Sequence, residues 1–102
     1  MTEMVFFDHQ IHSCLKKAKN FFVDAIGAAK NGNLEASEIL MEQGSANLAN
    51  GEQIINIFAQ KDICQGEKAC NLLLLQAQES LVSTENFKKS IVELIDTYRW
   101  IN

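Results

Sequence analysis

The sequence contains no proline and only five glycines in 102 residues. Proline interrupts helices and glycine weakens them, so their scarcity leaves long stretches of chain free to be helical. The longest aliphatic run is Leu72–Leu75, far short of the roughly 20 apolar residues that a membrane-spanning helix needs. The opening residues MTEMVFFDHQ have neither a basic region nor a sustained apolar one, so we expect no signal peptide. These absences favour a single cytoplasmic domain over residues 1–102.

Positive charge is also scarce. Eight lysines and one arginine, Arg99, stand against thirteen acidic residues, for a net charge of −4. Proteins that bind nucleic acid usually carry a basic patch or stripe, and many anion sites gather several arginines. The composition therefore excludes a typical nucleic-acid binder and an arginine-based anion site.

The three cysteines, Cys14, Cys64 and Cys70, are odd in number and have no C-x-x-C spacing. In a chain without a signal peptide, such cysteines are expected to be reduced thiols. A structural zinc site at Cys64 and Cys70 would need two more well-placed ligands. We therefore expect free cysteines that share no task.

Apolar residues recur at intervals of three and four along nearly the whole chain, which is typical of helices with one buried face. The pattern predicts three helices, at about residues 5–30, 34–63 and 72–99. The expected buried stripes are Phe7, Ile11, Cys14, Ala18, Phe22, Ala25 and Ala29; then Leu34, Met41, Leu48, Ile55 and Phe58; then Leu73, Ala77, Leu81, Thr84, Ile91, Ile95 and Tyr98. Gly44 and Gly51 fall on the second stripe, and we interpret them as positions where another helix approaches closely.

Two breaks separate these helices. At the first, Gly32 is expected to take the left-handed conformation that ends a helix, and Asn33 to cap the next one. So short a turn makes the two helices antiparallel neighbours. The second break is predicted at residues 64–69, with Asn71 capping the third helix.

The third predicted helix carries a second stripe at the same spacing: Leu72, Leu75, Glu79, Val82 and Asn86. A three-helix monomer has only one core to fill, so this additional and largely apolar stripe indicates self-association. The predicted fold is therefore all-α, an antiparallel up-down-up three-helix bundle that oligomerises.

Two segments of the chain resemble a known family. Residues 25–45, AIGAAKNGNLEASEILMEQGS, resemble the AL-x-AA-x-x-GDF-x-x-A-x-x-L turn region of the lactose/cellobiose-type enzyme IIA of the bacterial phosphoenolpyruvate-dependent sugar phosphotransferase system. Residues 72–98, LLLLQAQESLVSTENFKKSIVELIDTY, are similar to the third helix of that family, typically LL-x-VHAQDHLMTA followed by an amphipathic stretch. The resemblance covers about residues 11–98, and the third-helix motif is its specific part.

The resemblance implies a homotrimer in which the third helices line the threefold axis. It also implies a phosphoryl relay in sugar uptake: a histidine on the third helix accepts the group from the phosphocarrier HPr and passes it to a IIB component. An aspartate three residues after that histidine, one from each subunit, would meet a divalent metal ion at the axis.

At the site positions the chain departs from the family pattern. Gln76 stands where the family has its phosphoacceptor histidine, Glu79 replaces the metal-binding aspartate, and Ser80 replaces the histidine after it. Gln78, two residues after the acceptor position, is kept.

A second family histidine, in an AH-x-x-QT stretch of the second helix, is replaced by Asn50, although the glutamine is kept as Gln53.

Phosphoryl acceptance needs a nucleophilic nitrogen, which imidazole supplies near neutral pH. The amide nitrogen of Gln76 is hardly nucleophilic because its lone pair is delocalised into the carbonyl, so we expect no transfer through this position. Gln76 then either shapes a docking surface for HPr or IIB or has no role.

Glu79 has two interpretations. Three converging carboxylates repel one another, and a divalent ion with oxygen ligands at the trimer axis would compensate for their burial. Alternatively, the glutamates are protonated or bridged by water, since glutamate is one methylene longer than the aspartate of the family.

His9 and His12 lie beside Asp8 on the first predicted helix and could bind a metal or accept a phosphoryl group. A site with two ligands is weak, so exposed histidines near a helix start are the simpler interpretation. A nearby basic cluster fits a solvated helix face: Lys16, Lys17 and Lys19.

The sequence thus supports two hypotheses. The first is a IIA-like component of a sugar phosphotransferase system, trimeric but deficient in phosphotransfer because of Gln76. The second is a non-catalytic helical module for oligomerisation, regulation or the joining of other proteins.

Overall fold

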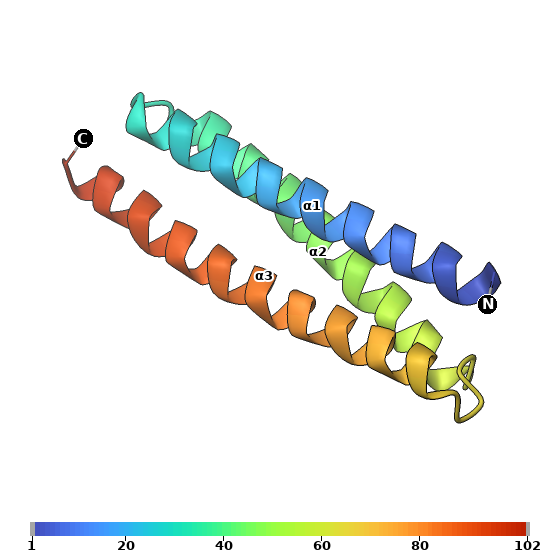
Figure 1. The fold of residues 1–102 in the computed structure, drawn as a ribbon. Helices are drawn as coiled ribbons and strands as arrows, with labels where there is room; N and C mark the ends of the chain where they lie inside the picture. The colour runs from blue at the N-terminus through green and yellow to red at the C-terminus, as the bar shows by residue number, and fades with distance from the viewer. Residues whose placement is uncertain (1, 102) are drawn as a thin grey trace.

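The computed structural model describes residues 2–101, which form three long helices joined by two turns (Figure 1). The helices are α1 (Thr2–Lys30), α2 (Leu34–Gln60) and α3 (Lys68–Ile101). Figure 1 shows α2 returning beside α1 and α3 reversing direction again, so the predicted all-α, antiparallel three-helix bundle is confirmed. The bundle is a rod measuring 53 × 17 × 16 Å. No helix within residues 2–101 is both long enough and apolar enough to cross a membrane.

The core runs along the rod and is centred on α1. The predicted stripes face the interior of the bundle, and their buried members are Ile11, Ala18, Phe22, Ala25, Ala29, Leu48, Ile55, Phe58, Ala77, Thr84, Ile91 and Ile95. All of these except Phe58 and Thr84 belong to this main core, and Phe58 belongs to a smaller cluster at one end of the bundle. The periodicity of three and four therefore located the buried face of each helix.

Small residues bring α1 and α2 close together. A Cβ atom added to Gly44 would lie 2.5 Å from Cε1 and 2.7 Å from Cδ1 of Phe22, whose side chain is fully buried. A Cβ atom at Gly51 would lie 3.1 Å from Cδ2 of Leu15. The buried Ser37 hydroxyl donates a hydrogen bond of 2.8 Å to the backbone oxygen of Ala25 across the same interface. The interpretation of both glycines as close-packing positions is confirmed.

The turn between α1 and α2 has the predicted chemistry. Gly32 has φ +84°, and the Asn33 side chain accepts a hydrogen bond of 3.1 Å from the Ala36 N–H. The N–H groups of Gly32 and Asn33 donate to the carbonyls of Ala29 and Ala28, which satisfies carbonyl groups left free at the end of α1. A tight turn with both helix ends capped holds α1 and α2 as a hairpin.

The turn between α2 and α3 differs from the prediction. α2 ends at Gln60 rather than near residue 63, and α3 begins at Lys68 rather than near residue 72. The Asn71 N–H donates a hydrogen bond of 3.0 Å to the Glu67 carbonyl, so Asn71 belongs to the first turn of α3 and does not cap it. The chain reverses earlier because Asp62 and Gln65 adopt φ values of +47° and +48°, which few non-glycine residues do.

The prediction of three free, unrelated cysteines was wrong for two of them. Cys64 and Cys70 form a disulfide across the second turn, with their Cα atoms 5.2 Å apart, while Cys14 is free and half-buried on α1. Their sequence spacing does not reveal this pairing. The turn brings the two Cα atoms within the range that a disulfide spans.

Candidate functional site

The positions that the family motif singles out lie on the outside of the bundle. Gln76, Gln78 and Glu79 are exposed on α3, beside the buried Ala77. Residues two apart on a helix point to nearly opposite sides, so the Gln76 and Gln78 side chains diverge. One partner surface therefore does not readily engage both side chains of the same chain.

The two site positions on α2 are exposed as well. Asn50 and Gln53 flank the stretch where Gly51 is buried against Leu15. Within residues 2–101, no hydrogen bond or ion pair joins any two of the five predicted site residues. A single chain thus presents these side chains to solvent and does not assemble them into an enclosed site.

The second stripe of α3 forms an exposed apolar face, which we call the outer face: Leu72, Leu75, Glu79, Val82 and Asn86. The side chains of Leu72, Leu75 and Val82 are 60%, 50% and 53% exposed. In Figure 1 no other helix covers the side of α3 that is turned away from α1 and α2. Exposed large apolar side chains at helical spacing are typical of a surface that packs against another helix.

Glu79 lies in the middle of the outer face, one helical turn from Leu75 and Val82. Among residues 2–101, no group of three histidine, cysteine, aspartate or glutamate side chains could hold a metal ion. A metal ion at Glu79 therefore needs carboxylates from other copies of the chain. Carboxylate oxygens suit a hard divalent cation, so the donor type fits if several copies meet there.

The two histidines are separate from these positions. His12 Nε2 lies 3.2 Å from Asp8 Oδ1, one turn away on α1, and both side chains are partly solvated. His9 is exposed on the same helix. The pair of histidines lies near the start of α1, and no third ligand joins them among the described residues.

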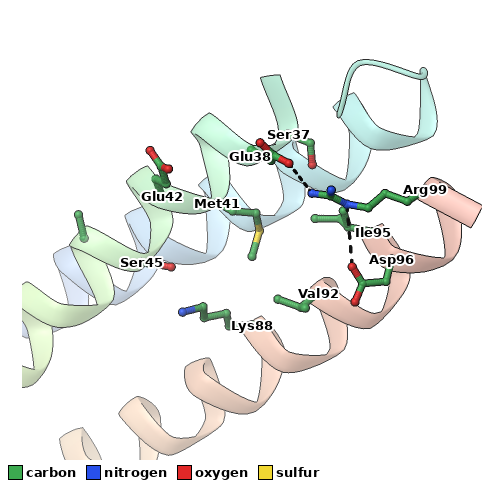
Figure 2. Close-up of a pocket in the computed structure, with 11 residues that line it drawn as sticks. Ser37, Glu38, Met41, Glu42, Ser45, Lys88, Val92, Ile95, Asp96 and Arg99 are labelled. Carbon is green, nitrogen blue, oxygen red and sulfur yellow. Dashed lines mark hydrogen bonds and ion pairs between the residues drawn. The ribbon is translucent and has the colours of Figure 1, made fainter. Parts of the chain in front are cut away.

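Sequence reasoning did not anticipate a groove of about 740 Å³ between α2 and α3 (Figure 2). Met41 and Val92 line it with apolar groups, and Arg99 closes one end by an ion pair of 2.6 Å with Glu38. Arg99 Nε also lies 4.0 Å from Asp96 Oδ1. The only sequence signal was the spacing of Lys88, Val92 and Arg99, which mixes apolar and charged groups along one edge of α3.

Comparison with known proteins places these features in a family. Residues 10–99 match the lactose/cellobiose specific IIA subunit of the phosphotransferase system. The chain is 25% identical over 100 residues to the oligo-beta-mannoside-specific EIIA component of the phosphotransferase system of Bacillus subtilis (strain 168). The aligned region covers 98% of this chain and 89% of the relative. No solved structure matches the chain.

The family match extends over nearly all of the three-helix bundle, including the whole outer face and the five site residues on α2 and α3. The chain therefore belongs to the lactose/cellobiose-specific IIA family of the sugar phosphotransferase system.

Proposed function

We propose that this chain is a cytoplasmic IIA component that retains the scaffold of the sugar phosphotransferase system but does not carry a phosphoryl group at position 76. The observation that supports this proposal most directly is the family match over residues 10–99, combined with an exposed glutamine, Gln76, at the acceptor position of the α3 motif. Its work is then to bind HPr or a IIB component, competing with an active IIA protein and so regulating the relay.

The chemistry at position 76 supports this proposal. The site is open to solvent, so access to a donor does not limit it. Transfer from a phosphohistidine needs a nucleophilic acceptor, and the nitrogen lone pair of a primary amide is delocalised into the carbonyl group, so the amide is a very poor acceptor. Neither histidine of the chain lies on α3, so neither replaces the missing imidazole at this surface.

We also propose that the chain forms a trimer through the outer face of α3. Leu72, Leu75 and Val82 repeat at intervals of three and seven, the pattern by which helices pack side by side. Association of three copies would remove these half-exposed side chains from water, with roughly 25 cal/mol gained per Å² of apolar surface buried.

In such a trimer, the three Glu79 carboxylates would lie near the axis. Their mutual repulsion is costly in a partly buried site, and a divalent cation with oxygen ligands would offset it. We expect chelation to weaken the native trimer and to leave a Glu79→Gln trimer unaffected, as measured by sedimentation with elemental analysis. A native trimer that stays intact and free of metal would remove the metal from this proposal.

The test of function is intact-mass spectrometry after incubation with phosphoenolpyruvate, enzyme I and HPr. We expect the native chain to stay unmodified and Gln76→His to gain one phosphoryl group. Gln78→His is the matched control, since it places the same imidazole on the same exposed helix but on the opposite side. We expect it to stay unmodified.

The other outcomes favour different functions. Phosphorylation of the native chain would contradict the proposal and point to His9 or His12 as the acceptor. If Gln76→His also stays unmodified, the docking surface is absent, and a helical module for oligomerisation or the joining of other proteins becomes the better description.

A further inference from the structure

The Cys64–Cys70 disulfide lies at the end of the bundle where α2 turns into α3. Cys64 is in the turn and is 6% exposed, and Cys70 is in the first turn of α3 and is 2% exposed. Both side chains pack against Met4 and Phe58 in a small cluster separate from the main core. The disulfide therefore joins a turn, the start of a helix and a local apolar cluster.

Besides the disulfide, the turn is held by the half-buried Ile63, which packs against the same cluster, and by a few backbone hydrogen bonds. The other residues of the turn are largely exposed, and two of its backbone hydrogen bonds run from Gln65 N–H to the Asp62 carbonyl and from Glu67 N–H to the Cys64 carbonyl. Asp62 and Gln65 have positive φ values, which cost free energy for residues with a side chain. Opening the disulfide would thus remove the main covalent restraint on a backbone that is unfavourable by itself.

We propose that Cys64 and Cys70 form a reversible redox site in which closing the disulfide orders residues 61–71. The chemical partner is a low-molecular-weight disulfide of the glutathione type. The proposal goes beyond the proposed IIA function and does not depend on it.

The oxidation proceeds by two thiol–disulfide exchanges. The Cys64 thiolate attacks one sulfur of the small disulfide, a mixed disulfide forms, and one small thiolate leaves and takes up a proton. The Cys70 thiolate then attacks Cys64 Sγ, the protein disulfide forms, and the second small thiolate leaves and is protonated. In total, the protein dithiol gives up two electrons and two protons, and one small disulfide becomes two small thiols.

The structure assigns the two roles. Cys64 lies among exposed turn residues, so local opening of the turn brings it to solvent first. Cys70 is held on α3 and is more deeply buried, so it is the thiol that resolves the mixed disulfide. Cys14 lies at the α1–α2 interface near Gly51 and takes no part in the disulfide.

The test uses the full chain carrying Cys14→Ala, equilibrated in buffers with varied ratios of reduced to oxidised glutathione. Free thiols are then alkylated and the intact mass is measured. We expect two populations, one with both cysteines alkylated and one with neither, and their proportions should change with the glutathione ratio. The oxidised form is expected to have a melting temperature higher by on the order of 10 °C.

Hydrogen exchange supplies the second readout and an internal control. Reduction should speed amide exchange in residues 61–71 and leave the first turn, residues 31–33, unchanged. A chain with Cys64→Ser and Cys70→Ser added should respond to the glutathione ratio in neither mass nor melting temperature. If those serine variants do not fold, the reduced Cys14→Ala chain serves as the open state.

Three results would overturn the proposal. The first is alkylation of both cysteines at every glutathione ratio, or a glutathione adduct that persists. The second is a disulfide that stays closed in fully reducing buffer. The third is a disulfide that opens and closes with no change in melting temperature or in the exchange of residues 61–71.

Discussion

The α1–α2 hairpin and helix α3 differ in how tightly they are packed within the bundle. The hairpin has a capped, tight turn, a buried inter-helix hydrogen bond at Ser37, and glycines that let its two backbones approach. α3 packs on one side only, leaves a groove against α2, and keeps a row of apolar side chains in water. This difference supports the proposal that the hairpin is the scaffold and that α3 carries the surface for association with other molecules.

Among substitutions that distinguish the hairpin from α3, we expect the largest effect for Val82→Glu, which should weaken self-association. Val82 and Val23 are 53% and 52% exposed, so Val23→Glu on α1 is a closely matched control. Burying an unpaired charge at an interface costs several kcal/mol, so Val82→Glu should weaken self-association by about a thousandfold or more. Val23→Glu should leave it unchanged.

Sedimentation of both variants at several concentrations measures this difference. Equal association of Val82→Glu and the native chain would contradict the assignment of the outer face. Equal loss in both variants would show that association depends on net charge and not on a particular face.

The next effect concerns the hairpin. Gly44→Ala places a methyl group against the buried Phe22 ring, and such overpacking costs about 1–3 kcal/mol of unfolding free energy. Gly51→Ala should cost less because its nearest contact is the end of the Leu15 side chain. Gly27→Ala has nothing within 4 Å of the new methyl group and should stabilise the chain by up to about 1 kcal/mol.

Urea unfolding at one fixed protein concentration compares these three variants, since association shifts the apparent stability. A Gly44→Ala chain as stable as Gly27→Ala would show that α1 and α2 do not approach as closely as described.

A smaller effect is expected for Ser37→Ala. It removes the buried hydrogen bond to the Ala25 carbonyl and should cost about 1 kcal/mol. The control is Ser90→Ala, which removes an exposed bond within α3 and should change stability by less than about 0.5 kcal/mol. Identical unfolding midpoints for the two variants would contradict the structural role of Ser37.

The smallest effect belongs to the groove. The Glu38–Arg99 ion pair is exposed, so Glu38→Gln should lower the free energy of unfolding by less than about 1 kcal/mol. The loss should disappear in 1 M salt, where the screening length falls to roughly 3 Å. Glu42→Gln, one turn further along α2, is the control; a loss at Glu38 that persists in high salt would point to a packing effect.

The sequence predicted the hairpin better than the second turn, for physical reasons. Helical periodicity and the pair Gly32 and Asn33 are local signals, and they located the helices and the first cap. The second turn depends on positive φ values at Asp62 and Gln65, residue types that give no such signal. The Cys64–Cys70 disulfide depends on a distance across that turn, so counting cysteines led to the wrong expectation.

In the candidate site, too, the sequence predicted the local features but not those that depend on the tertiary arrangement. The motif located Gln76, Gln78 and Glu79 on one helix, and periodicity separated the outer face of α3 from its core face. The groove between α2 and α3 could not be predicted, because its width depends on how the two helices diverge in space. Whether the site residues contact one another depends likewise on tertiary arrangement.

The most direct test of the account is a titration of the isotope-labelled chain with HPr, followed by amide chemical shifts. We expect the shifts to concentrate on α3 around Gln76 and the first turn, residues 31–33, not to respond. An absence of shifts at high HPr concentration, or shifts centred on the α1–α2 turn, would contradict the assignment of α3 as the docking surface.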